Sequence, residues 1–84
     1  WLQYYDMDAA PGGELDSDGH QRGAVECLTV LKGTLEAEVG GVIETVKEGE
    51  TVRYRCDRRH IIRNRTDAPA RAFMVCLLKA AVLE

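Results

Sequence analysis

Short apolar segments separated by turn-forming residues are the feature that most constrains how this chain can fold. Glycine, proline, aspartate or asparagine interrupts the apolar pattern about every eight to twelve residues. No stretch carries a sustained helical repeat of apolar residues. This spacing is typical of an all-β sandwich or barrel, and we expect about six or seven short strands and no long helix.

The expected strands follow the alternation of apolar and polar residues. Residues 2–7 alternate loosely, and residues 9–23, rich in Gly, Asp and Ser, are expected to form a long loop of the kind that is often functional. The clearest hairpin joins two strands through Gly40 and Gly41. The strand expected over residues 25–32 is apolar on both faces, so we expect it to be covered on both sides. The expected strands after the loop are 25–32, 34–39, 42–46, 51–55, 60–64 and 70–78, the last as a buried closing strand.

The 84-residue chain has room for one domain, because a body this small hides only about 60–65% of the surface that its unfolded form exposes. Its 45% apolar and 30% charged residues are typical of a folded globular protein. No apolar run reaches the roughly 18 residues of a membrane span, and no signal peptide is apparent. We expect one cytoplasmic domain over residues 1–84, processed or excised from a longer protein because it starts at Trp1.

The three cysteines Cys27, Cys56 and Cys76 are odd in number and lack a C-x-x-C spacing. This argues against both a disulfide framework and a thiolate zinc site. We expect them to be small buried or half-buried hydrophobic residues rather than redox groups.

The net charge of −3 hides an asymmetry along the chain. Up to Glu50 there are eleven acidic and three basic residues, and afterwards three acidic and eight basic ones. The basic stretch over residues 53–59 is a footprint that nucleic-acid-binding proteins share. Arg53 and Arg55 lie two apart, however, which places both on one face of a strand. We favour a solvated face over a nucleic-acid interface.

Histidine is scarce, and His20 and His60 each lie just before or at the start of an expected core strand. In an antiparallel barrel, two imidazoles and the carboxylate of Glu26 could converge on one divalent ion. The alternative is that both histidines are structural residues at strand starts.

Two segments resemble the motifs of the cupin family. Residues 49–64, GETVRYRCDRRHIIRN, resemble the second cupin motif, and residues 20–33 resemble the first. A short hairpin separates them, as in that family, and the resemblance implies a small cupin-type β-barrel, also called a double-stranded β-helix or jelly roll. The matching residues are His20, Glu26 and Gly33 in the first motif and Gly49, His60 and Asn64 in the second.

The departures from the family pattern matter for the site. Arg22 stands where the family has its second histidine ligand, so the resemblance implies only His20, Glu26 and His60 as ligands of one Zn, Fe, Mn or Ni ion. A guanidinium cannot bind a metal, and at roughly 7 Å from one it would be repelled by several kcal/mol. Arg22 therefore either turns outward as an exposed loop residue or replaces the metal and binds a carboxylate, sulfate or phosphate group.

Five other residues also carry expectations. In the resemblance Asn64 flanks the cavity, and its alternative role is a strand-end cap or turn residue. Cys27 should face away from the cavity because it neighbours Glu26. Tyr4 and Tyr5, together with Trp1, are expected to pack against the fold rather than to form a subunit contact.

The sequence around both motifs is similar to the C-terminal sensor halves of helix-turn-helix regulators of the XRE type. That resemblance implies a homodimeric domain that binds a small-molecule effector in a pocket, with DNA contact through a separate domain absent from these residues. Arg22 would suit an anionic effector. The alternatives are a small metal-dependent enzyme, of dioxygenase or isomerase type, and a structural dimerisation module with its cavity packed shut. Two points count against the enzyme. Arg22 replaces one of the family's four metal ligands, and no further carboxylate or histidine lies where the motifs would place a catalytic base in the cavity. The expected pocket residues are His20, Arg22, Glu26, His60 and Asn64.

Overall fold

A computed structural model describes residues 2–19 and 22–77, and in this part of the chain it contains strands and no helix. The all-β class expected from the sequence is therefore confirmed. No helix within these residues is long and apolar enough to cross a membrane. The strands are β1 (Leu2–Ala9), β2 (Glu14–Ser17), β3 (Val25–Lys32), β4 (Thr34–Val39), β5 (Val42–Lys47), β6 (Thr51–Arg55), β7 (His60–Arg63) and β8 (Ala70–Leu77).

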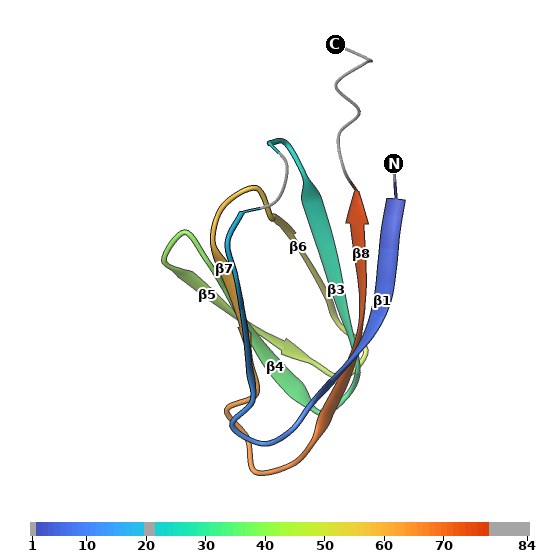
Figure 1. Cartoon of the computed structure of the whole chain (residues 1–84). Coiled ribbons are helices and arrows are strands. Elements are labelled where there is room, and N and C mark those ends of the chain that lie inside the picture. Colours follow the sequence, from blue (N-terminus) through green and yellow to red (C-terminus); the bar gives the residue numbers. More distant parts are fainter. Residues whose placement is uncertain (1, 20–21, 78–84) are drawn as a thin grey trace.

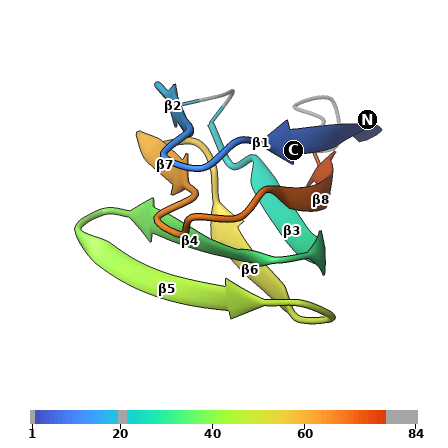
Figure 2. The ribbon, with the colours of Figure 1, turned by 90° about the horizontal axis from the view of Figure 1, so that it is seen from below.

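The strands form two four-stranded antiparallel sheets that face each other (Figure 1). One sheet has the order β1-β8-β3-β6 and the other the order β2-β7-β4-β5. Apart from the β4–β5 hairpin, each connection carries the chain from one sheet to the other, as the view from below also shows (Figure 2). The edge strands are β1 and β6 in one sheet and β2 and β5 in the other.

The core lies between the sheets, where alternate residues of each strand point inward. On β3 the buried positions are Glu26, Leu28 and Val30, and the intervening residues are half-buried. The expectation that this strand is covered on both sides is therefore confirmed only for the face that meets the opposite sheet, because its other face is half-buried or exposed. The apolar core cluster comprises Ala9, Leu28, Val30, Leu35, Ala37, Val46, Ile62, Ala70, Ala72 and Met74.

The N-terminal part departs most from the expected strand pattern. The first strand extends to Ala9, and β2 lies inside the segment that was expected to be a loop. Its register places Glu14 opposite Arg63 and Ser17 opposite His60. Backbone pairing and charge hold this strand rather than apolar burial, since its one large apolar residue, Leu15, is exposed.

The remaining strands lie close to their expected positions. The strand expected over 60–64 ends at Arg63, so that Asn64 follows it. The closing strand β8 is described up to Leu77, and the expectations for Trp1 and for residues 78–84 lie outside the described part of the chain.

The expected hairpin between β4 and β5 is confirmed, with Val39 opposite Val42. Gly40 and Gly41 have φ values of 57° and 82°, the two positive values that a tight type I′ turn requires. Gly33, the glycine of the first motif, has φ of 83°, and a Cβ there would lie 3.0 Å from the carbonyl oxygen of Pro69. Only glycine fits at this point without a shift of the neighbouring strand.

The charge asymmetry of the sequence is explained by strand order. The basic strand β7 lies between β2 and β4, which are acidic. Arg63 binds Glu14 at 2.9 Å and Glu38 at 2.6 Å, and two further pairs join Arg59 to Asp16 and Arg65 to Glu36. Three bases of the second half therefore pair with four acids of the first half within one sheet. Arg53 and Arg55 are both exposed on β6, as expected for a solvated face.

Candidate functional site

A cluster of polar side chains lies between the two sheets, around the carboxylate of Glu26. Glu26 has no solvent exposure. Its Oε1 atom accepts a hydrogen bond from the hydroxyl of Tyr54, and its Oε2 atom accepts one from Tyr5 at 3.2 Å. The Nε2 atom of His60 lies 3.8 Å from Oε1. We call Tyr5, Glu26, Tyr54 and His60 the interior cluster.

Strand register explains why these residues meet. Glu26 on β3 lies opposite Tyr54 on β6 and opposite Cys76 on β8, so that all three point to the same face of one sheet. Tyr5 on β1 lies opposite Met74, two residues before Cys76, and therefore shares that face. His60 begins β7 in the opposite sheet. The interior cluster thus joins both sheets.

The imidazole of His60 is 2% exposed and is oriented by the backbone. Its Nδ1 atom lies 2.8 Å from the carbonyl oxygen of Arg58. Because a carbonyl oxygen only accepts, Nδ1 carries the hydrogen of this bond, and Nε2 is the atom that faces Glu26. Histidines that bind metals are held by their second nitrogen in the same manner.

Burial also affects the two tyrosines of the interior cluster. It raises the pKa of Tyr5 to about 12, and the nearby Glu26 carboxylate adds to the effect. Burial and the hydrogen bond to Glu26 likewise raise the pKa of Tyr54. Both hydroxyls therefore keep their protons at neutral pH and act as donors to the carboxylate.

The structure brings together two of the five residues that the sequence predicted for the site, Glu26 and His60. Arg22 is exposed in the turn before β3, as its alternative interpretation expects. Asn64 follows the last residue of β7, whereas His60 is the first residue of that strand. His20 lies outside the described residues.

Asn64 is 1% exposed, and its side-chain amide binds the protein on every side. Its Nδ2 atom donates to the carbonyl oxygens of Ala9 (2.9 Å) and Ala68 (2.8 Å). Its Oδ1 atom accepts from the backbone and the hydroxyl of Thr66. These contacts make Asn64 the cap of the turn between β7 and β8, the second role considered for it.

The described residues offer a metal two of the three ligands that the family resemblance implies. The Glu26 and His60 atoms are 3.8 Å apart, which one ion can bridge with bonds of about 2.0–2.2 Å. A carboxylate has about four lone-pair sites, and the two tyrosines use two of those of Glu26. Glu26 and His60 therefore fit a metal, and the third ligand would be His20.

Sequence reasoning missed four residues beside Glu26, namely the two tyrosines and two cysteines. The Sγ atoms of Cys56 and Cys76 lie 3.6 Å apart, and both residues are buried. Burial raises the pKa of Cys56 to about 12 and also raises that of Cys76. All three cysteines are free, with Cys27 half-buried on the outer face of β3 as expected. Only the strand register, which the sequence does not contain, could have identified these neighbours.

Asp57, in the connection between β6 and β7, holds that connection against the turn before β3. Its Oδ2 atom accepts hydrogen bonds from the backbone N–H of Gly23 (2.9 Å) and from the guanidinium of Arg55 (2.7 Å). These bonds lower the pKa of Asp57 to about 2. They join the β6–β7 connection to the turn that carries Arg22, immediately before β3.

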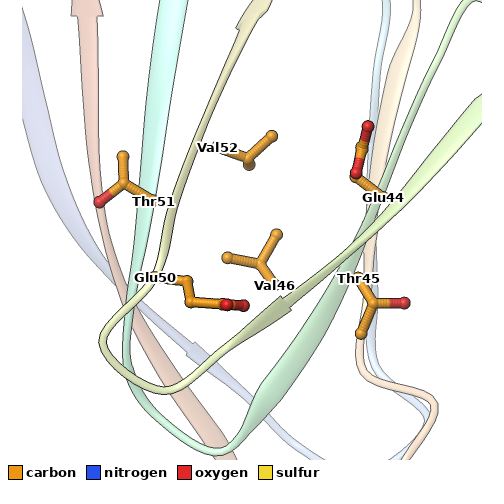
Figure 3. A pocket seen from close by; sticks show the side chains of 6 residues that line it. All are labelled: Glu44, Thr45, Val46, Glu50, Thr51 and Val52. Carbon is orange, nitrogen blue, oxygen red and sulfur yellow. The ribbon is translucent and has the colours of Figure 1, made fainter.

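An opening lies between β5 and β6, where the two sheets do not pair. Val46 and Val52 lie between these strands, and Glu44 lies farther along β5 (Figure 3). The cavity here has a volume of about 370 Å³. A neighbouring cavity of about 210 Å³ is also lined by Glu44 and Val52 and reaches Tyr54. Tyr54 therefore connects this opening with the interior cluster.

Comparisons with known proteins agree with this geometry. The cupin domain family matches residues 5–76. The HTH-type transcriptional regulator SutR of Escherichia coli (strain K12) is 34% identical over 63 residues, which are 75% of this chain and 35% of SutR. This chain thus spans about a third of the length of that regulator.

Solved structures include the cupin domain of an XRE family transcriptional regulator from Enterobacter cloacae. It superposes with a TM-score of 0.89 and 25% identity, covering 94% of this chain and 83% of that one. An HTH_3 family transcriptional regulator from Vibrio cholerae gives a TM-score of 0.88 at 19% identity, covering 94% of this chain and 44% of that one. With residues 5–76 matched and the two-sheet fold shared, this chain belongs to the cupin family.

Proposed function

We propose that this chain is the effector-binding cupin domain of an XRE-type transcriptional regulator. The observation that carries the proposal is the interior cluster. Burying a carboxylate costs several kcal/mol unless charges and hydrogen bonds compensate it, and apolar residues would stabilise such a core at least as well. A buried Glu26 held by two tyrosines and a histidine is therefore better explained by ligand binding than by folding.

The similarity to regulator cupin domains supports the regulatory half of the proposal. DNA contact would then belong to a helix-turn-helix domain outside residues 1–84, and the chain would form the C-terminal domain of a cytoplasmic regulator. The described residues contribute no helix that could enter a DNA groove.

The proposed effector is a small molecule or a metal ion. The opening between β5 and β6 is the proposed entrance, since Tyr54 lines its cavity and binds Glu26. A bound Zn, Fe, Mn or Ni ion would be held by His20, Glu26 and His60, and it would supply a Lewis acid that fixes a further ligand. For an anionic effector, Arg22 would supply a guanidinium outside the interior cluster, and Asn64 remains part of the proposed binding set.

Homodimer formation is also part of the proposal. β1 is an edge strand, and its residues Leu2 and Tyr4 are 54% and 65% exposed. Leu77, which pairs with Leu2, is exposed as well. Apolar side chains gathered along a sheet edge are suited to pairing with a second copy. Sedimentation of the chain should therefore give a dimer that dissociates in Tyr4→Asp.

Thermal melting of the chain, purified without a metal-affinity tag, tests the effector site. The probes are sulfate, phosphate, acetate, Fe²⁺, Mn²⁺ and Ni²⁺, each alone. A probe at 100 times its Kd should stabilise the fold by about 2.7 kcal/mol, and the shift should disappear in Glu26→Gln and His60→Ala. Arg22→Ala should abolish only shifts caused by anions. Probe shifts that persist in both interior variants would contradict the proposal.

The same preparation separates the sensor from the metal-dependent enzyme. Elemental analysis with near-stoichiometric metal, lost in His60→Ala, would indicate a metal site. Turnover of an added organic substrate in the presence of that metal would favour the enzyme. A metal-free chain that melts at higher temperature with an anion would favour the sensor.

A further inference from the structure

Two buried cysteines and the interior carboxylate form a second set of ligand atoms in this barrel. The Sγ atoms of Cys56 and Cys76 and a carboxylate oxygen of Glu26 all lie within 4.8 Å of one another. The three side chains are 0–1% exposed. The two cysteines belong to neither of the positions that the cupin motifs assign to ligands, and they bring softer donor atoms to the site than histidine or carboxylate.

The path of the backbone explains how the two sulfurs meet. Cys56 follows β6, and its N–H donates to the carbonyl oxygen of Ala24 at 3.0 Å. Cys76 lies on β8, opposite Glu26. β3 lies between β6, which Cys56 follows, and β8, which carries Cys76. Ala24, which is fully buried and packs with both cysteines, is small enough to let the two side chains approach each other above it.

This arrangement disfavours a disulfide bond. Two interstrand spacings of about 4.8 Å place residues on strands two apart roughly 9–10 Å from each other in a flat sheet. Disulfide formation needs Cα atoms within about 7 Å. The strand order therefore disfavours a direct bond between the two cysteines, and the 3.6 Å that separates their sulfurs leaves room for a bridging atom.

The separation of the sulfurs matches a tetrahedral thiolate site. Zinc–sulfur bonds of about 2.3 Å at the tetrahedral angle place two sulfurs about 3.8 Å apart, and the observed separation is 3.6 Å. Two neutral thiols in contact would also lie near this distance. A third ligand beside the two sulfurs therefore distinguishes a metal site from a simple contact between thiols. Glu26 supplies that ligand, because its tyrosine partners occupy only two of its lone-pair sites.

We propose that Glu26, Cys56 and Cys76 bind a soft divalent cation, represented by Zn²⁺, through one carboxylate oxygen and two thiolates. On binding, each thiol loses its proton to solvent, so that two protons leave the thiols for each ion bound. Tyr5 and Tyr54 keep their bonds to Glu26 and orient the carboxylate, as outer partners of metal ligands do. Three protein ligands leave the fourth tetrahedral position for an added ligand.

The spacing of the cysteines in the sequence argued against a thiolate zinc site, because local pairs such as C-x-x-C usually form one. In this fold, strand pairing rather than short spacing in the sequence brings the two cysteines together. This inference does not depend on the proposed regulatory function, since its test measures metal ligation directly.

The test uses the untagged, reduced chain after treatment with a chelator. Competition with a chromophoric chelator should show one Zn²⁺ per chain. Co²⁺ in the same site should give the intense visible bands of a tetrahedral ion and a thiolate-to-cobalt charge-transfer band in the near ultraviolet. Cys56→Ser and Cys76→Ser should weaken zinc binding by at least the roughly 10–100-fold that loss of an outer partner costs, and should remove the charge-transfer band.

Cys27→Ser is the matched control, because Cys27 lies beside Glu26 on β3 but on the outer face; it should bind as the unaltered chain does. Should the buried variants fail to fold, the cobalt spectrum of the unaltered chain still decides. Absence of zinc binding, cobalt binding without a charge-transfer band, or a Cys56–Cys76 disulfide in chain prepared without reductant would each overturn the proposal. Anion binding by a zinc-free chain would leave the proposed function intact.

Discussion

The Nε2 atom of His60 lies 3.8 Å from the Oε1 atom of Glu26, although the two residues belong to different sheets. Both side chains are almost completely buried. The contact therefore joins the sheets at the end of the barrel where β7 begins, and it does so inside a low-dielectric interior where electrostatic interactions are strong.

We expect the stability contributions of Glu26 and His60 to be strongly coupled. His60→Leu removes the imidazole beside the buried carboxylate and leaves the carbonyl oxygen of Arg58 without its donor, which should cost about 1–3 kcal/mol. In Glu26→Leu/His60→Leu, neither member of the pair remains, and the total loss should be smaller than the sum of the two single losses. Urea denaturation of the four proteins measures this coupling. Additive losses would show that the two side chains act independently.

The two tyrosines that bind Glu26 should differ in importance. Tyr54 is half-buried and its hydroxyl binds Oε1, whereas Tyr5 is 41% exposed and its bond is 3.2 Å long. Tyr54→Phe should therefore cost about 1.5–3 kcal/mol, the range for a hydrogen bond to a charged group, and Tyr5→Phe should cost less. Tyr4→Phe, on the same strand as Tyr5, is the control. Equal losses for Tyr5 and Tyr54 would contradict this ranking.

Sequence patterns were sufficient for the strands that bury apolar residues. β3, β4 and β6 have the predicted bounds, because their alternation and flanking glycines reflect the core directly. β2 was missed for the opposite reason. Its segment ELDS has one apolar residue, which is exposed, and the strand exists because β7 offers it backbone partners and arginines.

The site was predictable only as far as the motifs extend. The motif positions identified Glu26 and His60, which do meet. Tyr54 and Cys76 are neighbours of Glu26 because both adjacent strands pair with β3 in one particular register. A shift of one residue would turn either side chain to the outer face, so no reading of a single strand could assign them.

Asn64 provides a test of its two interpretations. Asn64→Ala leaves the buried carbonyl oxygen of Ala9 without its donor, whereas the carbonyl oxygen of Ala68 still accepts a bond from the hydroxyl of Thr66. The variant should therefore lose about 1–3 kcal/mol, the cost of one unsatisfied buried group. Asn64→Asp keeps the acceptor for Thr66 but sets a buried carboxylate oxygen against the carbonyl oxygen of Ala9, so at neutral pH it should cost more than Asn64→Ala. Denaturation measures the loss. A folded Asn64→Ala with full stability but no response to the probes would instead favour a role in ligand binding.

Asp57 should make the stability of this fold sensitive to acid. Its pKa lies near 2 in the folded chain, below the ordinary value of 3.8, chiefly because Arg55 and the N–H of Gly23 bind its carboxylate. A lowered folded pKa means that the stabilisation is complete above the ordinary value and is lost as the pH falls through about 2. Asp57→Asn should therefore be less stable than the unaltered chain at pH 7, and the difference should shrink towards pH 2.

Arg55→Gln should show a smaller change of the same sign, and Arg53→Gln, two residues earlier on the same exposed face, should behave as the unaltered chain. Melting curves across this pH range measure the effect, and a stability difference between the unaltered chain and Asp57→Asn that is constant with pH would show that the charge of Asp57 does not hold the turn before β3.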